Sequence, residues 1–259
     1  MSVAIKAVGL AAPGLAGWAD AAPILAGTRG YVPAPESAYA PALLPPNERR
    51  RATAAVKLAF RAAEDAVTGS GADARELPSV FASSDADMSV LHRICAALAQ
   101  RPRLISPTDF HNSVHNAASG YWSIGVGSMA PTTTLSAHDA SFVAGLIEAV
   151  ALARERAADV LLVAYDVVAP PPLAAKRPLA ISAGVALILG PMAGTHGSLE
   201  IDLDGDRETA CDDPALETLR TGNPALRALP LLSLIAARRA GAVTLRGTGG
   251  LHVAARYTP

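Results

Sequence analysis

The most concentrated group of polar side chains in the sequence lies at 136–141, Ser-Ala-His-Asp-Ala-Ser. It follows a β-branched segment that ends at Leu135 and precedes a segment in which apolar residues recur at helical spacing. A turn from a strand into a helix presents free backbone N–H groups and the positive end of the helix dipole, which favour a nucleophile or an oxyanion. Ser136, His138 and Asp139 are therefore the first candidates for acyl-transfer or hydrolytic chemistry.

A self-contained Ser/His/Asp triad is nevertheless disfavoured at this turn. Residues that are neighbours in sequence seldom aim their side chains at one another, and the sequence has no Gly-x-Ser-x-Gly nucleophile elbow. Aspartate is also a preferred N-cap residue, and a cap at Asp139 would stabilise the following helix by about 0.5–2 kcal/mol. The structural interpretation of Asp139 is therefore the stronger one.

The remaining reactive residue types give no complete site. His111 and His115 are spaced i, i+4, which would suit two metal ligands on one helical face, but a third ligand and the Glu of a His-Glu-x-x-His motif are missing. Cys95 lies on the apolar face of an expected helix, which predicts a buried, inert thiol, and the two aspartates after Cys211 would raise a thiol pKa. The glycine-rich segment 247–250 connects two expected strands, which disfavours a phosphate cradle. We expect no metal ion, no cofactor and no cysteine nucleophile.

The charge balance argues against several classes of function. The 259 residues include 22 Lys and Arg against 23 Asp and Glu, so no basic field attracts nucleic acid or an anionic membrane. Hydrophobic residues make up 51% of the chain, which is ample for a buried core. The uncharged stretch 178–195 is interrupted by Gly184, Gly190 and Pro191, which predicts a buried strand and not a membrane span. With two cysteines and no signal-peptide pattern, we expect a cytoplasmic protein.

Periodicity and turn signals predict the elements that position these residues. We expect strands at 3–9, 79–82, 131–135, 159–164, 185–189, 198–202, 242–245 and 252–255. We expect a first long helix that begins after Asn47, as its N-cap, and stops at the Gly-Ser-Gly of 69–71. Further helices are expected at 88–100, from about Phe110, at 140–156 and at 214–239, the last with a break at Asn223-Pro224. The segments from 131 to 164 form a βαβ unit, whose parallel strands need helices on both faces of the sheet. The fold class is therefore α/β with α-β-α layers.

One spacing resembles a motif of the β-ketoacyl synthases. In that family an Asn is followed by Gly, Ile, Gly and Pro, then by a strand and a Thr-Ala-Cys nucleophile turn. The same spacing is kept here by Asn116, Gly120, Ile124, Gly127 and Pro131. The resemblance is best over 48–190 and implies a thiolase-like fold, with 1–259 as a single ketosynthase-like domain.

The departures from the family pattern concern its chemistry. Counting in the same register places Asp139 where the family has its catalytic cysteine, or His138 if the register shifts by one. The histidine motifs of the family's C-terminal catalytic half are not found in the sequence. A carboxylate is a poor acyl-transfer nucleophile compared with a thiolate. The resemblance thus implies a subunit without catalytic residues of its own.

Segments 110–122 and 135–146 look, more narrowly, like the chain length factors of aryl polyene and xanthomonadin-type pigment clusters. That resemblance implies pairing with a catalytic ketosynthase, whose acyl tunnel this chain would shape and which an acyl carrier protein would visit. Two alternatives remain open. One is an independent acyl-handling enzyme, resembling an acyltransferase or a thioesterase, that uses Ser136, His138 and Asp139. The other is a homodimeric scaffold with no acyl role.

Two groups of site residues follow from the resemblance. The helix at 88–100 would close the end of the tunnel, although its apolar face would equally suit core packing against the sheet. The tunnel candidates on that face are Met88, Leu91, His92 and Cys95. Segment 111–135 would form the partner interface, because it is uncharged from Asn116 onward. The interface candidates are His111, His115, Asn116, Tyr121, Trp122 and Thr133.

Overall fold

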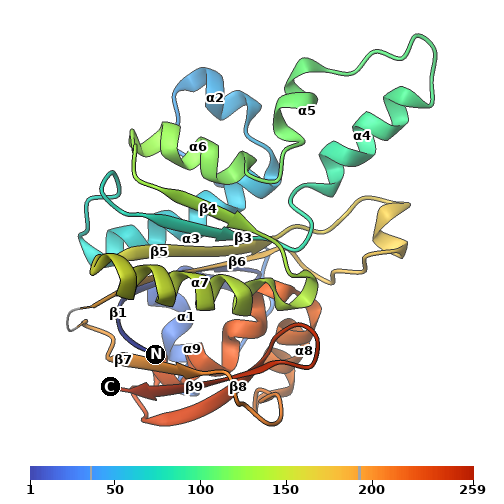
Figure 1. The fold of residues 1–259 in the computed structure, drawn as a ribbon. Helices are drawn as coiled ribbons and strands as arrows, with labels where there is room; N and C mark the ends of the chain where they lie inside the picture. The colour runs from blue at the N-terminus through green and yellow to red at the C-terminus, as the bar shows by residue number, and fades with distance from the viewer. Residues whose placement is uncertain (36, 192–193) are drawn as a thin grey trace.

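The computed structural model describes residues 1–35, 37–191 and 194–259, and Figure 1 shows their arrangement. A nine-stranded sheet runs through them in the order β4-β3-β5-β6-β1-β7-β9-β8, with β2 paired to the end of β1. The strands are β1 (Ser2–Ala12), β2 (Leu15–Ala16), β3 (Ser79–Ala82), β4 (Thr132–Leu135), β5 (Val160–Asp166), β6 (Ala183–Gly190), β7 (Ser198–Asp202), β8 (Gly241–Arg246) and β9 (His252–Thr258). All the strands expected from the sequence are present, with ends that differ by a few residues.

The first five strands of this order form the layer that positions the polar turn. Strands β4, β3 and β5 are parallel, and β6 runs antiparallel to both β5 and β1. Because β3 lies between β4 and β5, the chain crosses over β3 on its way from β4 to β5, as the predicted βαβ unit requires. The carboxyl ends of three parallel strands therefore meet at one edge of the sheet.

Helices cover both faces of the sheet, which confirms the α-β-α layers. One face packs against α3 (Ala54–Ser70) and α6 (Ala117–Val126). The opposite face packs against α7 (Ser141–Arg156), α1 (Trp18–Leu25), α8 (Pro214–Gly222), the 3-10 helix η3 (Pro224–Ala228) and α9 (Leu229–Ala236). The break expected at Asn223-Pro224 separates α8 from η3. Figure 1 shows α3 behind the upper strands, α7 in front of them, and α1 and α9 between the upper strands and β7, β9 and β8.

Helix α3 begins later than the sequence predicts. A separate short helix, α2 (Pro46–Arg51), precedes it, and Ala52 between them is extended. The N-cap of α3 is Thr53, whose hydroxyl accepts a hydrogen bond from the Val56 N–H, and Gly71 ends the helix in the left-handed conformation. The expectation of one helix capped by Asn47 was therefore wrong, because Thr53 offers a cap inside the expected run.

Two helices extend away from this body as an arm (Figure 1). The arm consists of α4 (Met88–Leu98), whose N-cap is Asp87, and α5 (Pro107–Asn112). Within α4, which the structure describes throughout, Val90 is the buried residue, whereas Leu91 and Leu98 are each 45% exposed. The apolar face of α4 therefore does not pack against the sheet, and the core-packing interpretation is wrong for this chain. The prediction that Cys95 is buried was also wrong, because its side chain is exposed.

The C-terminal third extends the sheet beyond β1. Strand β7 pairs with the start of β1, and β9 and β8 follow as an antiparallel pair joined by the glycine-rich turn, as expected. The uncharged stretch at 178–195 contains β6, all eight residues of which are buried. Among the described residues, no helix combines the length and the hydropathy needed to cross a membrane.

Candidate functional site

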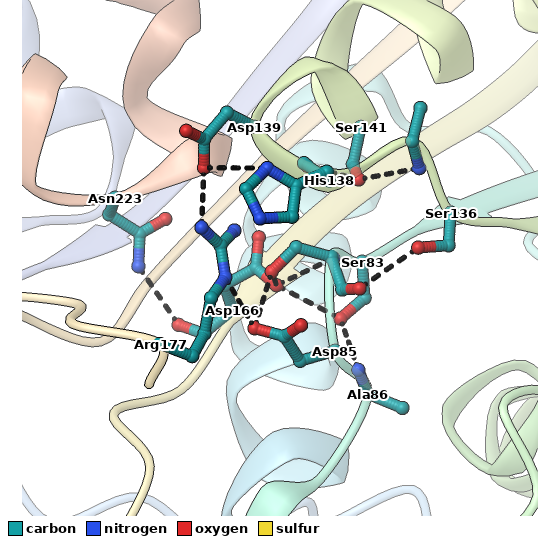
Figure 2. Close-up of polar contacts among 12 residues, drawn as sticks. Ser83, Asp85, Ala86, Ser136, His138, Asp139, Ser141, Asp166, Arg177 and Asn223 are labelled. Atoms are coloured by element: carbon teal, nitrogen blue, oxygen red, sulfur yellow. Dashed lines mark hydrogen bonds and ion pairs between the residues drawn. The ribbon is translucent and has the colours of Figure 1, made fainter. Parts of the chain in front are cut away.

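A polar cluster lies at the sheet edge where the parallel strands end (Figure 2). Ser83, Ser84 and Asp85 follow β3, the 136–141 turn follows β4, and Asp166 is the last residue of β5. In open α/β sheets this carboxyl edge is where ligand and catalytic sites lie, because loops from several strands converge there. The cluster is therefore the candidate functional site.

The turn after β4 enters α7 through a short 3-10 helix, η1 (His138–Ala140). The N-cap of α7 is Ala140, and no side chain caps the helix there. The Ser141 hydroxyl instead closes the turn: it accepts from the Ala137 N–H at 3.0 Å and donates to the His138 carbonyl at 2.7 Å. Asp139 makes no capping hydrogen bond at this helix start. The predicted N-cap role of Asp139 was wrong, because the 3-10 turn moves the start of α7 to Ser141 and leaves the carboxylate facing Arg177.

The three candidates for a triad do not assemble into one. The Ser136 hydroxyl donates to the Ser84 carbonyl at 2.9 Å, and in the part of the chain described it has no hydrogen bond to His138. His138 Nδ1 lies 3.6 Å from Asp139 Oδ1, and both side chains are largely exposed. A nucleophile needs its base within hydrogen-bonding distance, and Ser136 has none here.

Arg177 connects the turn to the segment after β3. It belongs to the loop between β5 and β6, and its side chain is 11% exposed. Nε donates to Asp85 Oδ2 at 2.8 Å, and Nη1 donates to Asp139 Oδ1 at 2.7 Å. Burial acts to raise the pKa of Asp139, but the hydrogen bond and charge of Arg177 outweigh it and hold the pKa below its usual value. Asp139 is therefore an ionised partner of Arg177 at neutral pH, which leaves it a weak base.

Asp166 is the deepest member of the cluster, with 2% of its surface exposed. Its Oδ1 accepts from the Ser83 hydroxyl at 3.1 Å, the Ser84 N–H at 2.7 Å and the Ser84 hydroxyl at 2.6 Å. Burial raises the pKa of Asp166 to about 7, although the bonds from Ser84 and Ser83 oppose the shift. Asp166 thereby ties the end of β5 to the loop after β3.

Backbone strain is concentrated in the same cluster. His138 and Ala86 both have positive φ, 52° and 55°, a conformation that is costly for residues with a Cβ. The Ala86 N–H donates to the Ser83 hydroxyl at 2.9 Å, and the Ser83 carbonyl faces His115 Nε2 at 3.2 Å. Such strain persists where surrounding bonds over-determine it, as at active sites and switches.

A cavity of about 220 Å³ lies beside the turn. Its walls are the 137–140 backbone, the glycine-rich 246–249 turn between β8 and β9, and the side chains of Glu208 and Arg227. The fold thus brings the glycine-rich segment against the 136–141 turn, although they lie about a hundred residues apart in sequence. Glu208 is already paired with Arg220 and Arg227, so the cavity holds polar groups but no free thiol or activated hydroxyl among the described residues.

Arg177 and Asp166 were not among the site residues predicted from the sequence. The signal for Arg177 is that Lys176 and Arg177 are the sole Asp, Glu, Lys or Arg residues between Asp166 and Glu200. The signal for Asp166 is a carboxylate that ends a continuous apolar strand. Neither signal says which residue each group meets, because their partners come from other strands.

The interface candidates divide into exposed and buried residues. His111 and Asn116 are exposed, and His115 and Thr133 are half-buried. Tyr121 and Trp122, at 2% and 1% exposure, belong to the core under α6, where the Trp122 ring packs edge-on against Phe60. Their assignment to a partner interface is corrected, because this face of α6 turns toward α3.

The two histidines do not share a helical face. Helix α5 ends at Asn112, so His111 lies on α5 and His115 in the loop after it. His111 packs edge-on against Tyr121, whereas His115 faces the Ser83 carbonyl. No cluster of three or more His, Cys, Asp or Glu side chains that would hold a metal ion is present in the described ranges. For Cys211, burial and the neighbouring acids, Glu217 first, raise the pKa to about 12, which confirms the predicted direction.

Exposed apolar residues are found along the arm and on α6. These residues are Leu91, Leu98, Leu104, Phe110, Val114 and Ile124. A mainly apolar groove of about 410 Å³ lies between α5 and α6. Strand β4 ends the sheet next to α6, where the Thr134 and Ser119 hydroxyls bond at 3.0 Å. We call the residues of this list, together with β4, the arm face.

Solved structures with a similar fold include several ketosynthase complexes. A chain of the ketosynthase ApeO in complex with its chain length factor ApeC from Xenorhabdus doucetiae matches with a TM-score of 0.73 at 22% identity, over 100% of both chains. The ishigamide ketosynthase/chain length factor matches with a TM-score of 0.72 at 14% identity, also over 100% of both chains. The type II polyketide synthase complex AntDE:AntF matches with a TM-score of 0.74 at 12% identity, over 99% of both chains.

At these identities the likeness establishes the fold, which is the thiolase-like fold of ketosynthases. A search of curated protein sequences returned no match. The N-terminal domain of the β-ketoacyl synthases matches residues 26–244, which is most of the 259-residue chain. The protein therefore belongs to the β-ketoacyl synthase family.

Proposed function

We propose that this chain is a non-catalytic subunit, similar to a chain length factor, that pairs with a catalytic β-ketoacyl synthase and shapes its acyl tunnel. The observation that carries the proposal is the ion pair between Asp139 and Arg177. By resemblance, Asp139 or His138 stands where the family has its nucleophilic cysteine. A carboxylate held by a guanidinium is neither a thioester-forming nucleophile nor an effective base.

The hydroxyls near the turn support the same conclusion. Ser136 donates to the Ser84 carbonyl, and Ser141 donates to the His138 carbonyl. Acyl transfer would need one of them to leave its structural bond and find a base within about 3.2 Å. The independent acyl-handling enzyme is therefore the weaker alternative.

The arm face supports a role in pairing. An open edge strand presents unpaired backbone groups to another chain, and a large exposed apolar surface marks a protein contact. Strand β4 and the helices α4, α5 and α6, each of which carries exposed apolar residues, lie at the same end of the sheet. Two of the similar structures are described as a ketosynthase with its chain length factor, which favours a ketosynthase as the partner.

The position of α4 supports the tunnel role. Its exposed Leu91 and Cys95 lie beside half-buried Met88 and His92, on one helical face that the described residues cover only in part. A partner packed on the arm face would enclose this row and turn it into the wall of a channel. We place the closed end of the acyl tunnel there.

The pathway follows from the same resemblance. The segments at 110–122 and 135–146 suggest aryl polyene synthesis or a related type II fatty acid or polyketide-like route in the cytoplasm. In such a route an acyl carrier protein delivers the growing chain to the complex.

Coexpression with a candidate catalytic ketosynthase from the same source tests the proposal. The two should copurify at equal stoichiometry, and condensation of malonyl and acyl carrier thioesters should require both. Thioester hydrolysis or acyl transfer by this chain alone would contradict the proposal and favour the independent enzyme.

The tunnel role has its own test. Leu91→Trp should shorten the carrier-bound products of the complex, and Leu91→Ala should permit further elongation, as measured by mass spectrometry. Because Leu91 is 45% exposed in the chain alone, neither change should unfold it. Leu203→Trp is a matched control, since Leu203 is similarly exposed after β7. Unchanged product lengths in both Leu91 variants would place the tunnel end elsewhere.

A further inference from the structure

The polar cluster contains two buried groups without a partner among the described residues, Oδ2 of Asp166 and Nη2 of Arg177. One is a carboxyl oxygen and the other a guanidinium donor, so each is the complement of the other. Arg177 instead uses Nε and Nη1 on Asp85 and Asp139. Figure 2 shows Arg177 and Asp166 together in the middle of the cluster. The cluster therefore contains the two halves of an ion pair that is not formed.

Asp166 is hydrogen-bonded through one of its two oxygens among the described residues. Three donors reach Oδ1, whereas Oδ2 is buried with none. Oδ2 is therefore left unsatisfied in either protonation state, but the cost is larger for the ionised form, which places negative charge on a buried oxygen without a donor. Because burial raises the pKa of Asp166 to about 7, the neutral form is present near neutral pH and the ionised form is within reach.

The charges around Asp166 are unbalanced. The titratable groups in and around the cluster are Asp85 and Asp87 on the segment after β3, Tyr165 on β5, Arg177 on the β5–β6 loop, His138 and Asp139 on the turn, and His115 behind Ser83. The Asn223 amide, just before η3, donates to the Asp166 carbonyl, and Arg227 on η3 contributes a positive charge that lowers the pKa of Asp139. Arg177 is the cation that hydrogen-bonds both Asp85 and Asp139. Ionisation of Asp166 adds a competitor for it.

We propose that Arg177 is a proton-controlled latch, which holds Asp139 and Asp85 while Asp166 is protonated and turns its free Nη2 to Asp166 when Asp166 loses its proton. The move exchanges an ion pair with the half-exposed Asp139 for one with a fully buried carboxylate. A buried charge left unpaired costs several kcal/mol, whereas an exposed carboxylate is satisfied by water. Ionisation therefore favours the exchange.

The latch controls two strained segments. Release of Asp139 removes the tie between the β5–β6 loop and the turn that holds His138 at positive φ. Weakening of the Asp85 contact loosens the segment that carries Ala86 and leads into α4. Higher pH should therefore loosen the turn and the root of the arm. This conclusion concerns the chain itself and holds whether or not the partner is a ketosynthase.

Carboxyl-carbon NMR of the isotopically labelled full chain tests the latch between pH 5.5 and 8.5. Asp166 should titrate, and the signal of Asp139 should show an inflection at the same midpoint, since Asp139 loses Arg177 when Asp166 ionises. In Asp166→Asn the Asp139 inflection should vanish. An Asp139 signal without an inflection in the wild type, or one that persists in Asp166→Asn, would overturn the proposal.

Two further variants keep the test decisive if Asp166→Asn does not fold. Ser84→Ala removes a hydroxyl donor that stabilises ionised Asp166, so both inflections should move together to higher pH. Asp202→Asn removes an exposed acid on β7 and should leave both inflections unchanged. Inflections that separate in Ser84→Ala would show that the two residues titrate independently and would overturn the latch.

Discussion

Helices α3 and α4 both carry a stripe of apolar residues at helical spacing, but the stripes have different surroundings. The stripe of α3 is buried on the sheet, with Leu58, Ala59 and Ala62 at 5% exposure or less. The stripe of α4 is left uncovered on the arm, where Leu91 and Leu98 are each 45% exposed. An amphipathic pattern indicates that one face of a helix is buried against another element. It does not indicate whether that element belongs to the same chain or to a partner. The stripe of α4 is the stronger indication of a partner.

The largest expected difference between body and arm is in unfolding free energy. Phe60→Ala in α3 removes a fully buried ring and should cost about 3–5 kcal/mol. Leu91→Ala in α4 should stay within about 0.5 kcal/mol, because an exposed side chain leaves no cavity. Urea unfolding of the purified chain measures both. Equal losses would mean that the arm packs on the body in solution.

Association with the partner should depend on the arm face and not on the opposite end of the molecule. Thr133→Arg would bury an unpaired charge at the edge strand, which costs several kcal/mol and should weaken the complex about 100-fold or more. Thr221→Arg, an exposed position on α8, is the matched control and should bind normally. A binding titration compares them. A complex that tolerates Thr133→Arg would place the interface elsewhere.

Asp166, which ties β5 to the segment leading into α4, should make the stability of the folded chain depend on pH. The pKa of Asp166 is raised to about 7, from about 3.9 when unfolded, so between these values the folded chain keeps a proton that the unfolded chain has lost. The contribution of Asp166 is therefore complete below about pH 4 and falls by at most about 1.4 kcal/mol per pH unit up to about 7.

Thermal melts of the wild type and Asp166→Asn across this window measure the slope. The asparagine variant should lose this part of the pH dependence and gain relative stability at alkaline pH. Identical pH profiles for the two proteins would show that Asp166 ionises normally in the folded state.

The smallest expected effect is that of removing the Asp139 carboxylate. Its side chain is about half exposed, so the ion pair with Arg177 contributes no more than about 1 kcal/mol. Asp139→Asn and Asp139→Ala should therefore assemble with the partner and leave condensation near its normal rate. Loss of condensation in an intact complex would show that Asp139 acts chemically.

The fold was largely predictable because its signals are local. Strand β3, the helix after the turn and the break at Asn223-Pro224 follow from the periodicity and the proline or glycine positions of single segments. The start of α3 was misplaced because Asn47 and Thr53 both suit a cap, and the choice depends on the extended Ala52 between them. Local patterns cannot rank two adequate caps.

The candidate site was less predictable because its contacts join residues that follow different strands of the sheet. Spacing located Ser136, His138 and Asp139 at the turn, but Arg177 and Asp166 join it through the order of β4, β3 and β5. Tyr121 and Trp122 were assigned to an interface because the segment is uncharged, and the lack of charge suits a core equally well. A segment buried by its own chain and a segment buried by a partner are both apolar and uncharged in sequence, so the sequence does not distinguish them.

The central claim, that this chain shapes an acyl tunnel but carries no acyl group, is tested most directly by intact-protein mass spectrometry. The purified complex would be incubated with an acyl carrier thioester and the mass of each subunit measured. The account predicts that the ketosynthase subunit gains the acyl mass and this chain stays unmodified. An acyl adduct on this chain that is lost in Ser136→Ala would contradict it.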